Sequence, residues 1–216
     1  MIVLLPTSHV ARKSIEAIER AIESLRPDAV AVELDMDRYI ALSRGYESRI
    51  EFNAAWPILY IMKQIQQAIG RKAGIMPGRD MLEAVKNARN KGLPVMLIDQ
   101  HISITIGKIA KISWTEKLKL LGFIAYSVLL SPFSGDSIDL SKLPEGRLIE
   151  KAQLTLRIHF PQLNKALVEE RDLHMARMLE EQAQKHKNIL AVVGAGHIQG
   201  MKEMLRKRHK VQIYRY

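Results

Sequence analysis

The fold class is decided by residues 2–35, which read IVLLPTSHVARKSIEAIERAIESLRPDAVAVELD. Two short apolar runs, at 2–6 and 29–34, are rich in β-branched residues and end at turn or charged residues, as buried strands do. Between them, from residue 10 to 25, apolar side chains recur at helical spacing. Strand, helix and strand in this order form a β-α-β unit with parallel strands and a right-handed crossover. The sequence therefore predicts an α/β fold.

The same alternation continues along the chain of 216 residues. Further strands are predicted at residues 95–98, 189–193 and 211–214. Residues 36–92 and 101–187 have helical periodicity and are predicted to be mainly helical. We expect one domain over residues 1–216, with a small mixed, largely parallel sheet made from both chain ends. The helical middle region is expected to form a cap over this sheet.

Composition restricts both the chemistry and the partners. The chain has no cysteine, which excludes disulfides, thiolate nucleophiles and cysteine-ligated zinc. The formal net charge is +10, but no aromatic residues are interleaved with the basic run at 202–210, so no nucleic-acid binding is expected. No apolar stretch reaches the length of a transmembrane segment and no signal peptide is recognisable, so we expect a cytoplasmic protein. Membrane-surface association and homo-oligomerisation stay open.

Chemically useful side chains follow the ends of four predicted strands. His9 follows the first strand, Glu33 ends the second, Asp99 follows the third and His197 follows the fourth. Ligands of open parallel sheets bind outside the carboxyl ends of the strands. Without cysteine, two imidazoles with carboxylates are a ligand set that suits divalent Mn, Co or Zn. We therefore expect these side chains to meet at one edge of the sheet and to hold a divalent metal ion.

Simpler interpretations stay open for the same residues. A single histidine at a strand end is more often a surface or structural residue than a ligand. Glu33 closes an apolar strand and needs a partner, and a structural ion pair with nearby Arg38 is the alternative. Gly194 and Gly196 resemble part of a dinucleotide-binding fingerprint, but the spacing to Gly200 is one residue too long. We expect these glycines instead to let backbone N–H groups approach a bound anionic group.

Together these segments resemble the TraB/PrgY (pheromone shutdown) family. The segments that carry the likeness are TSHV at 7–10, PDAVAVELD at 27–35 with Arg38, LIDQ at 97–100 with Ile104 and Thr105, ERD at 170–172, and VVGAGHIQG at 192–200. The likeness spans nearly the whole chain, and the motifs in this order are more specific than any one of them. That family is similar to the TIKI metalloproteases and, more remotely, to the ChaN and erythromycin-esterase-like folds.

The resemblance implies a divalent ion held by two histidines and a glutamate, with hydrolysis of a peptide or small amide as the activity. Carried over to this chain, the metal ligands would be His9, His197 and Glu33. Catalytic roles would fall to Glu33, Arg38, Asp80 and Arg171, with Asp80 as a further ligand or general base and the arginines stabilising a tetrahedral intermediate. The residues expected to contact substrate are Gly194, Gly196, Asp99 and Asp172.

The chain departs from the family pattern close to these residues. Pro6 stands where the first Gly-x-x-His motif has glycine, and Asp80 stands where relatives generally have glutamate. Gln100 and His101 replace an Arg-Pro pair. The leading hypothesis is a metal-dependent hydrolase. The alternative is a non-catalytic protein that binds a peptide or another ligand in the same cleft.

Overall fold

Five strands form a single sheet in the computed structural model, which describes residues 1–7, 12–45, 78–129 and 145–215. The strands are β1 (Ile2–Thr7), β2 (Ala29–Val32), β3 (Val95–Leu97), β4 (Ile189–Gly194) and β5 (Val211–Ile213). Their order across the sheet is β3-β2-β4-β1-β5, and every pair is parallel. The predicted α/β class is confirmed, and the described sheet is parallel throughout rather than mixed.

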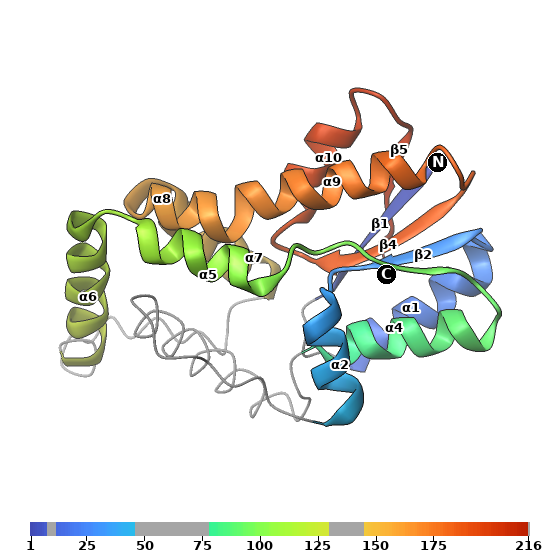
Figure 1. Ribbon diagram of the computed structural model, residues 1–216, viewed down its shortest axis with the longest axis horizontal. Coiled ribbons are helices and arrows are strands. Elements are labelled where there is room, and N and C mark those ends of the chain that lie inside the picture. Colours follow the sequence, from blue (N-terminus) through green and yellow to red (C-terminus); the bar gives the residue numbers. More distant parts are fainter. Residues whose placement is uncertain (8–11, 46–77, 130–144, 216) are drawn as a thin grey trace.

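Helices cover both faces of this sheet and continue beyond it (Figure 1). The helices are α1 (Arg12–Leu25), α2 (Met36–Arg44), α4 (Arg79–Asn90), α5 (Ile102–Lys111), α6 (Trp114–Leu129), α7 (Glu145–His159), α8 (Pro161–Asn164), α9 (Glu170–Gln182) and α10 (Ile198–Leu205). Between α8 and α9, residues Lys165–Glu169 form a π-helix, η1. Among the described residues, no helix is long and apolar enough to cross a membrane.

The two faces of the sheet bury alternate residues of each strand. In β1, Ile2 and Leu4 belong to a core shared with α9 and α10, whereas Val3 and Leu5 belong to a second core shared with α1 and α4. All four of these side chains are buried. A strand covered on both faces is apolar at every residue. This explains why the central strands were recognisable as uninterrupted apolar runs.

A third, smaller core holds α5, α6, α7 and α8 together on the left of Figure 1. Its buried members are Ile109, Ile112, Phe160, Leu163 and Ala166. The buried carboxylate of Glu116 on α6 accepts hydrogen bonds from the backbone of Gln162 and Leu163, at 3.2 and 2.8 Å. These bonds satisfy N–H groups at the start of α8, which intrahelical bonds leave unpaired.

Helix boundaries follow local capping signals. The Asp35 side chain accepts from the backbone N–H groups of Asp37 and Arg38, at 2.9 and 3.0 Å, so α2 begins at Met36, where the predicted helical region 36–92 starts. Gly45, with φ of 70°, ends this helix in the left-handed conformation. Residues 46–77 of the predicted helical region 36–92 lie outside the described residues.

Candidate functional site

The carboxyl ends of β1, β2 and β4 meet at one edge of the sheet. Thr7 is aligned with Gly194 in the register of β1 and β4, and Val32 is aligned with Val192 in the register of β2 and β4. Glu33 follows Val32 directly, and its backbone N–H donates to the Val192 carbonyl at 3.1 Å. The predicted convergence of strand ends therefore brings Glu33 and Gly194 together. The Gly194 N–H donates to Glu33 Oε2 at 2.6 Å.

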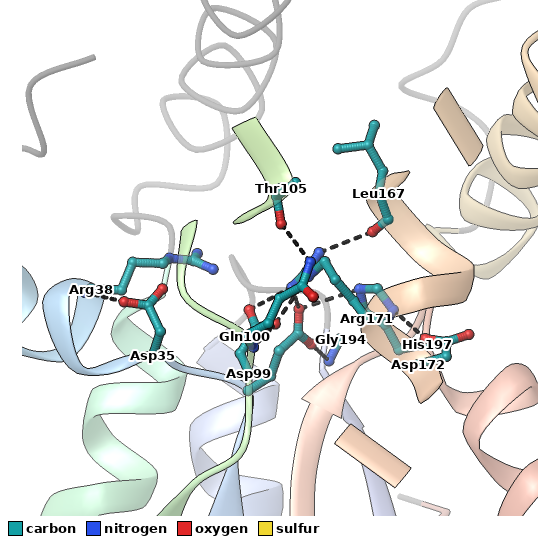
Figure 2. Close-up of polar contacts among 11 residues, drawn as sticks. Asp35, Arg38, Asp99, Gln100, Thr105, Leu167, Arg171, Asp172, Gly194 and His197 are labelled. Atoms are coloured by element: carbon teal, nitrogen blue, oxygen red, sulfur yellow. Dashed lines mark hydrogen bonds and ion pairs between the residues drawn. The ribbon is translucent and has the colours of Figure 1, made fainter. Parts of the chain in front are cut away.

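Arg171 joins this edge from the first turn of α9 (Figure 2). Its Nη2 donates to Glu33 Oε1 at 2.5 Å and to Asp99 Oδ2 at 2.8 Å, and its Nε donates to Asp99 Oδ1 at 3.0 Å. The side chains of Glu33 and Asp99 are 3% and 5% exposed, so both carboxylates need a buried cation. The planar guanidinium binds both because its N–H donors are fixed in a fork.

The π-helix η1 immediately precedes Arg171. The Glu170 N–H bonds to the Lys165 carbonyl, five residues back, as a π turn requires. Within this turn, the Leu167 carbonyl accepts from Arg171 Nη1 at 3.2 Å, which fixes the far side of the guanidinium. One extra residue per turn rotates everything that follows by about 100° relative to a continuous α-helix. The π turn therefore helps to set the direction in which Arg171 points.

His197 contacts two carboxylates at the start of α10. Its Nδ1 lies 2.6 Å from Asp172 Oδ1, and its Nε2 lies 3.3 Å from Glu33 Oε1. Asp172 is the neighbour of Arg171 on α9, so one helix turn supplies both the cation at Glu33 and the partner of His197. A histidine whose Nδ1 is held by a carboxylate has a fixed ring orientation, with Nε2 directed at the site.

Glycines in the loop and first turn of α10 allow the close approach of other side chains. A Cβ on Gly200 would lie 2.0 Å from Asp172 Oδ2, and a Cβ on Gly196 would lie 3.3 Å from Gln153 Nε2. The Gln153 amide also donates to the Gly196 carbonyl, next to His197. These close approaches to Gly196 and Gly200 are made by the protein's own side chains, and the Gly194 N–H donates to Glu33. Contact of Gly194 and Gly196 with a bound anionic group stays a prediction.

Burial and charge shift the protonation of this cluster. Burial lowers the pKa of His197, but the Glu33 charge and the hydrogen bond to Asp172 outweigh it and raise the pKa to about 9. Burial raises the pKa of Asp172, which the contact with His197 partly offsets. Burial also opposes the charge of Arg171, yet Glu33 and Asp99 raise its pKa above the ordinary value. At neutral pH, therefore, Arg171 and His197 both carry a positive charge next to the buried carboxylates.

Other residues predicted for the site lie elsewhere or outside the described residues. Arg38 lies in the first turn of α2 beside Asp35, to one side of the cluster in Figure 2, and the arginine that contacts Glu33 is Arg171. Asp80 is buried at the start of α4, which packs on the opposite face of the sheet from α9, and it accepts from the Met81 N–H at 2.9 Å. His9 lies outside the described residues.

Among the described side chains, His197 and Glu33 are placed as two neighbouring metal ligands would be. His197 Nε2 and Glu33 Oε1 are 3.3 Å apart, close to the roughly 3.4 Å between two ligands held tetrahedrally at about 2.1 Å from one ion. Asp172 at Nδ1 is the partner that metal-bound histidines usually have. Within residues 1–7, 12–45, 78–129 and 145–215, no group of three His, Asp or Glu side chains could hold a metal ion. The pair has the spacing of two metal ligands, and two ligands alone do not make a metal site.

Sequence reasoning missed Gln153 and the π-helix. Gln153 reaches the His197 loop from α7, 43 residues away along the chain, and no local motif signals that contact. Gln100 was noted only as a departure from the family pattern. Its amide donates to Thr105 Oγ1 at 2.8 Å, and its backbone N–H donates to Asp99 Oδ1 at 2.9 Å, so it helps to orient the carboxylate that binds Arg171.

The protein is thus an α/β protein in which a buried network of Glu33, Arg171, Asp99, His197 and Asp172 lies at the carboxyl edge of a parallel sheet. A comparison of the sequence with known protein families leads to the same family as the sequence motifs that contain these residues. The model of the TraB/PrgY/gumN family matches residues 1–212. The chain therefore belongs to the TraB/PrgY/gumN family.

Three relatives match the chain over part of their own length. The chain is 33% identical over 217 residues to a protein of Methanocaldococcus jannaschii that is described as uncharacterized. This alignment covers 95% of the chain and 53% of that relative. The chain is 25% identical over 231 residues to the TraB domain-containing proteins of Bos taurus and Homo sapiens, which covers 91% of this chain and 60% of each relative. The chain thus spans a little over half the length of these relatives.

Proposed function

We propose that the chain is a metal-dependent hydrolase that acts on a peptide or a small amide. The observation that supports this most directly is the arrangement of His197. Its Nδ1 is held by Asp172 at 2.6 Å, while its Nε2 faces the Glu33 carboxylate at 3.3 Å. An oriented imidazole beside a buried carboxylate at the carboxyl edge of a parallel sheet is the kind of ligand pair that such hydrolases use.

His197 and Glu33 would hold the ion, together with His9, which the family likeness adds and which lies outside the described residues. A bound divalent ion polarises a carbonyl and lowers the pKa of its water toward neutrality. Asp172 fixes the histidine ring, and the Gly194 N–H fixes the second oxygen of Glu33. We propose in addition that Asp80 acts as the base and that the substrate is a peptide. The proposal also includes a relation to the TIKI metalloproteases.

Calorimetric titration of chelator-stripped protein with Mn²⁺, Co²⁺ and Zn²⁺ tests the metal. We expect one ion to bind per chain, and we expect His197→Ala, Glu33→Gln and His9→Ala each to remove the binding. His174→Ala is a suitable control, because His174 on α9 is only partly buried and has no place in the network. Binding that survives His197→Ala and Glu33→Gln would sink the metal assignment.

The second candidate function is ligand binding without turnover. It is favoured by Arg171, four of whose five N–H donors are already used by Glu33, Asp99 and the Leu167 carbonyl, so that at most one donor, on Nη1, is left for a developing negative charge. Incubation with a diverse peptide library, followed by mass spectrometry with and without metal, separates the two functions. Cleavage that requires the metal and His197 supports the hydrolase, and intact peptides retained by the protein support the binder.

A further inference from the structure

The buried carboxylates at the sheet edge carry their own counter-ion. The side chains of Glu33, Asp99 and Arg171 are 3%, 5% and 16% exposed. Two carboxylates in such a site cannot stay ionised without a cation, and removing one partner of a buried ion pair is strongly destabilising. Arg171 supplies a cation that contacts both carboxylates, while His197 lies against Glu33.

We propose that Arg171 and a divalent ion compete for Glu33, so that the guanidinium sets how tightly the site binds metal. This inference rests on the proposed function, because it concerns the same ligand pair. The competition is over one atom. Glu33 Oε1 is the oxygen that faces His197 Nε2 at 3.3 Å, and it is also the oxygen that accepts from Arg171 Nη2 at 2.5 Å.

The geometry also shows how Arg171 can release Glu33 and stay paired. It makes one hydrogen bond to Glu33 and two to Asp99, where Nε and Nη2 bind the two carboxylate oxygens side by side. The Leu167 carbonyl holds Nη1 in addition. If Glu33 turns toward a metal ion, the bidentate pair with Asp99 remains. A positive charge then stays next to the ion and weakens its binding, because like charges repel strongly in a poorly solvated site.

The test is metal affinity, measured by calorimetry on chelator-stripped wild type, Arg171→Gln, Arg171→Lys and Arg177→Gln. Arg177 is an exposed arginine on the same helix, so its variant removes one positive charge outside the site. We expect Arg171→Gln to bind Mn²⁺ or Zn²⁺ about tenfold more tightly than wild type, or tighter still. Arg171→Lys keeps a cation and is expected to stay close to wild type, as is Arg177→Gln.

Thermal unfolding with and without metal covers the case in which Arg171→Gln is poorly folded. Its metal-free form should unfold at a lower temperature than wild type, because Asp99 loses the arginine that neutralises it and Glu33 keeps only His197 as a cationic neighbour. Added metal should raise its unfolding temperature more than it raises that of wild type, since the ion replaces the missing charge.

The outcomes separate this inference from the proposed function. Equal or weaker metal binding by Arg171→Gln, with normal binding by wild type, would overturn the competition and leave the metal site standing. Binding by Arg171→Gln alone would support the competition and count against a metal enzyme in the native chain. No binding by either protein would overturn both. An equal gain in Arg171→Lys would also overturn the inference, because the charge would then have no effect.

Discussion

At the scale of single residues, the site depends on close contacts that leave no room for an added atom. The Asp172 carboxylate contacts His197 through Oδ1, and its Oδ2 lies next to Gly200. A Cβ added to Gly200 would be only 2.0 Å from this oxygen. Helical glycine normally costs stability relative to alanine, by about 1 kcal/mol. Gly200 is kept in α10 because the carboxylate of another helix takes the space of its side chain.

Gly200→Ala should therefore destabilise the protein, by roughly 1–3 kcal/mol, against the trend for helices. The matched control is Gly107→Ala in α5, where nothing lies within 4 Å of the added Cβ and where a gain of up to about 1 kcal/mol is expected. Chemical denaturation of both variants measures the free energies of unfolding. Similar effects at the two positions would contradict the close contact between Asp172 and Gly200.

His197 should make stability depend on pH in the alkaline range. Its pKa rises from the ordinary 6.5 to about 9 in the folded chain, so the folded state holds this proton more tightly than the unfolded state. The resulting stabilisation, on the order of 3 kcal/mol, is fully present below about pH 6.5 and is lost as the pH rises through about 9.

Unfolding free energies of metal-free wild type and His197→Gln, measured from pH 6 to 10, check this dependence. The difference between the two proteins should shrink steadily above pH 6.5. A constant difference across this range would show that His197 holds no extra proton in the folded chain.

At the scale of elements, the π-helix η1 decides which way the start of α9 faces. Removing one residue from Lys165–Glu169 restores an α-helical register, and a helix turns by about 100° per residue. Deletion of the exposed Lys165 should therefore keep the helix but move Arg171 away from Glu33 and Asp99. Lys165→Ala removes the same side chain and keeps the register.

We expect the deletion to cost roughly 3–5 kcal/mol, the usual effect of leaving buried charges without their partner. Lys165→Ala should stay within about 0.5 kcal/mol of wild type, as surface substitutions do. Denaturation followed by circular dichroism measures both the stability and the helix content. A deletion variant as stable as Lys165→Ala would mean that η1 has no part in placing Arg171.

At the scale of the whole molecule, the chain divides into a sheet covered on both faces and a helical part with a smaller core of its own. The sheet's central strands, β1 and β4, are buried along almost all of their length. In its described residues, the helical part packs around five buried side chains, and α6 leaves Trp114 76% and Leu118 63% exposed. Local opening requires less free energy where fewer apolar contacts must be broken.

Hydrogen exchange followed by mass spectrometry should consequently show the slowest exchange in β1 and β4 and much faster exchange in α6. Adding metal should slow exchange at the start of α9 and α10, which carry Arg171, Asp172 and His197, and leave α6 unchanged. Protection of α6 equal to that of β4 would show that the chain opens as one cooperative unit.

The sequence determined the α/β class, the five strands and the family, because buried parallel strands are uninterrupted apolar runs and the motifs follow in a fixed order. It also indicated that Glu33, Asp99 and His197 meet at one edge, since parallel strands end on the same side of their sheet. Arg38 was the nearest candidate along the chain for an ion pair with Glu33, whereas the structure pairs Glu33 with Arg171.

Only the tertiary structure decided that Arg171, 138 residues further on, neutralises Glu33 and Asp99. It likewise decided that Asp172 orients His197 across Gly200, and that Gln153 holds the loop beside it. These pairings depend on how α7, α9 and α10 pack over the sheet and on the extra residue in η1. Local patterns carry no information on such contacts, because the partners are brought together only when the helices dock.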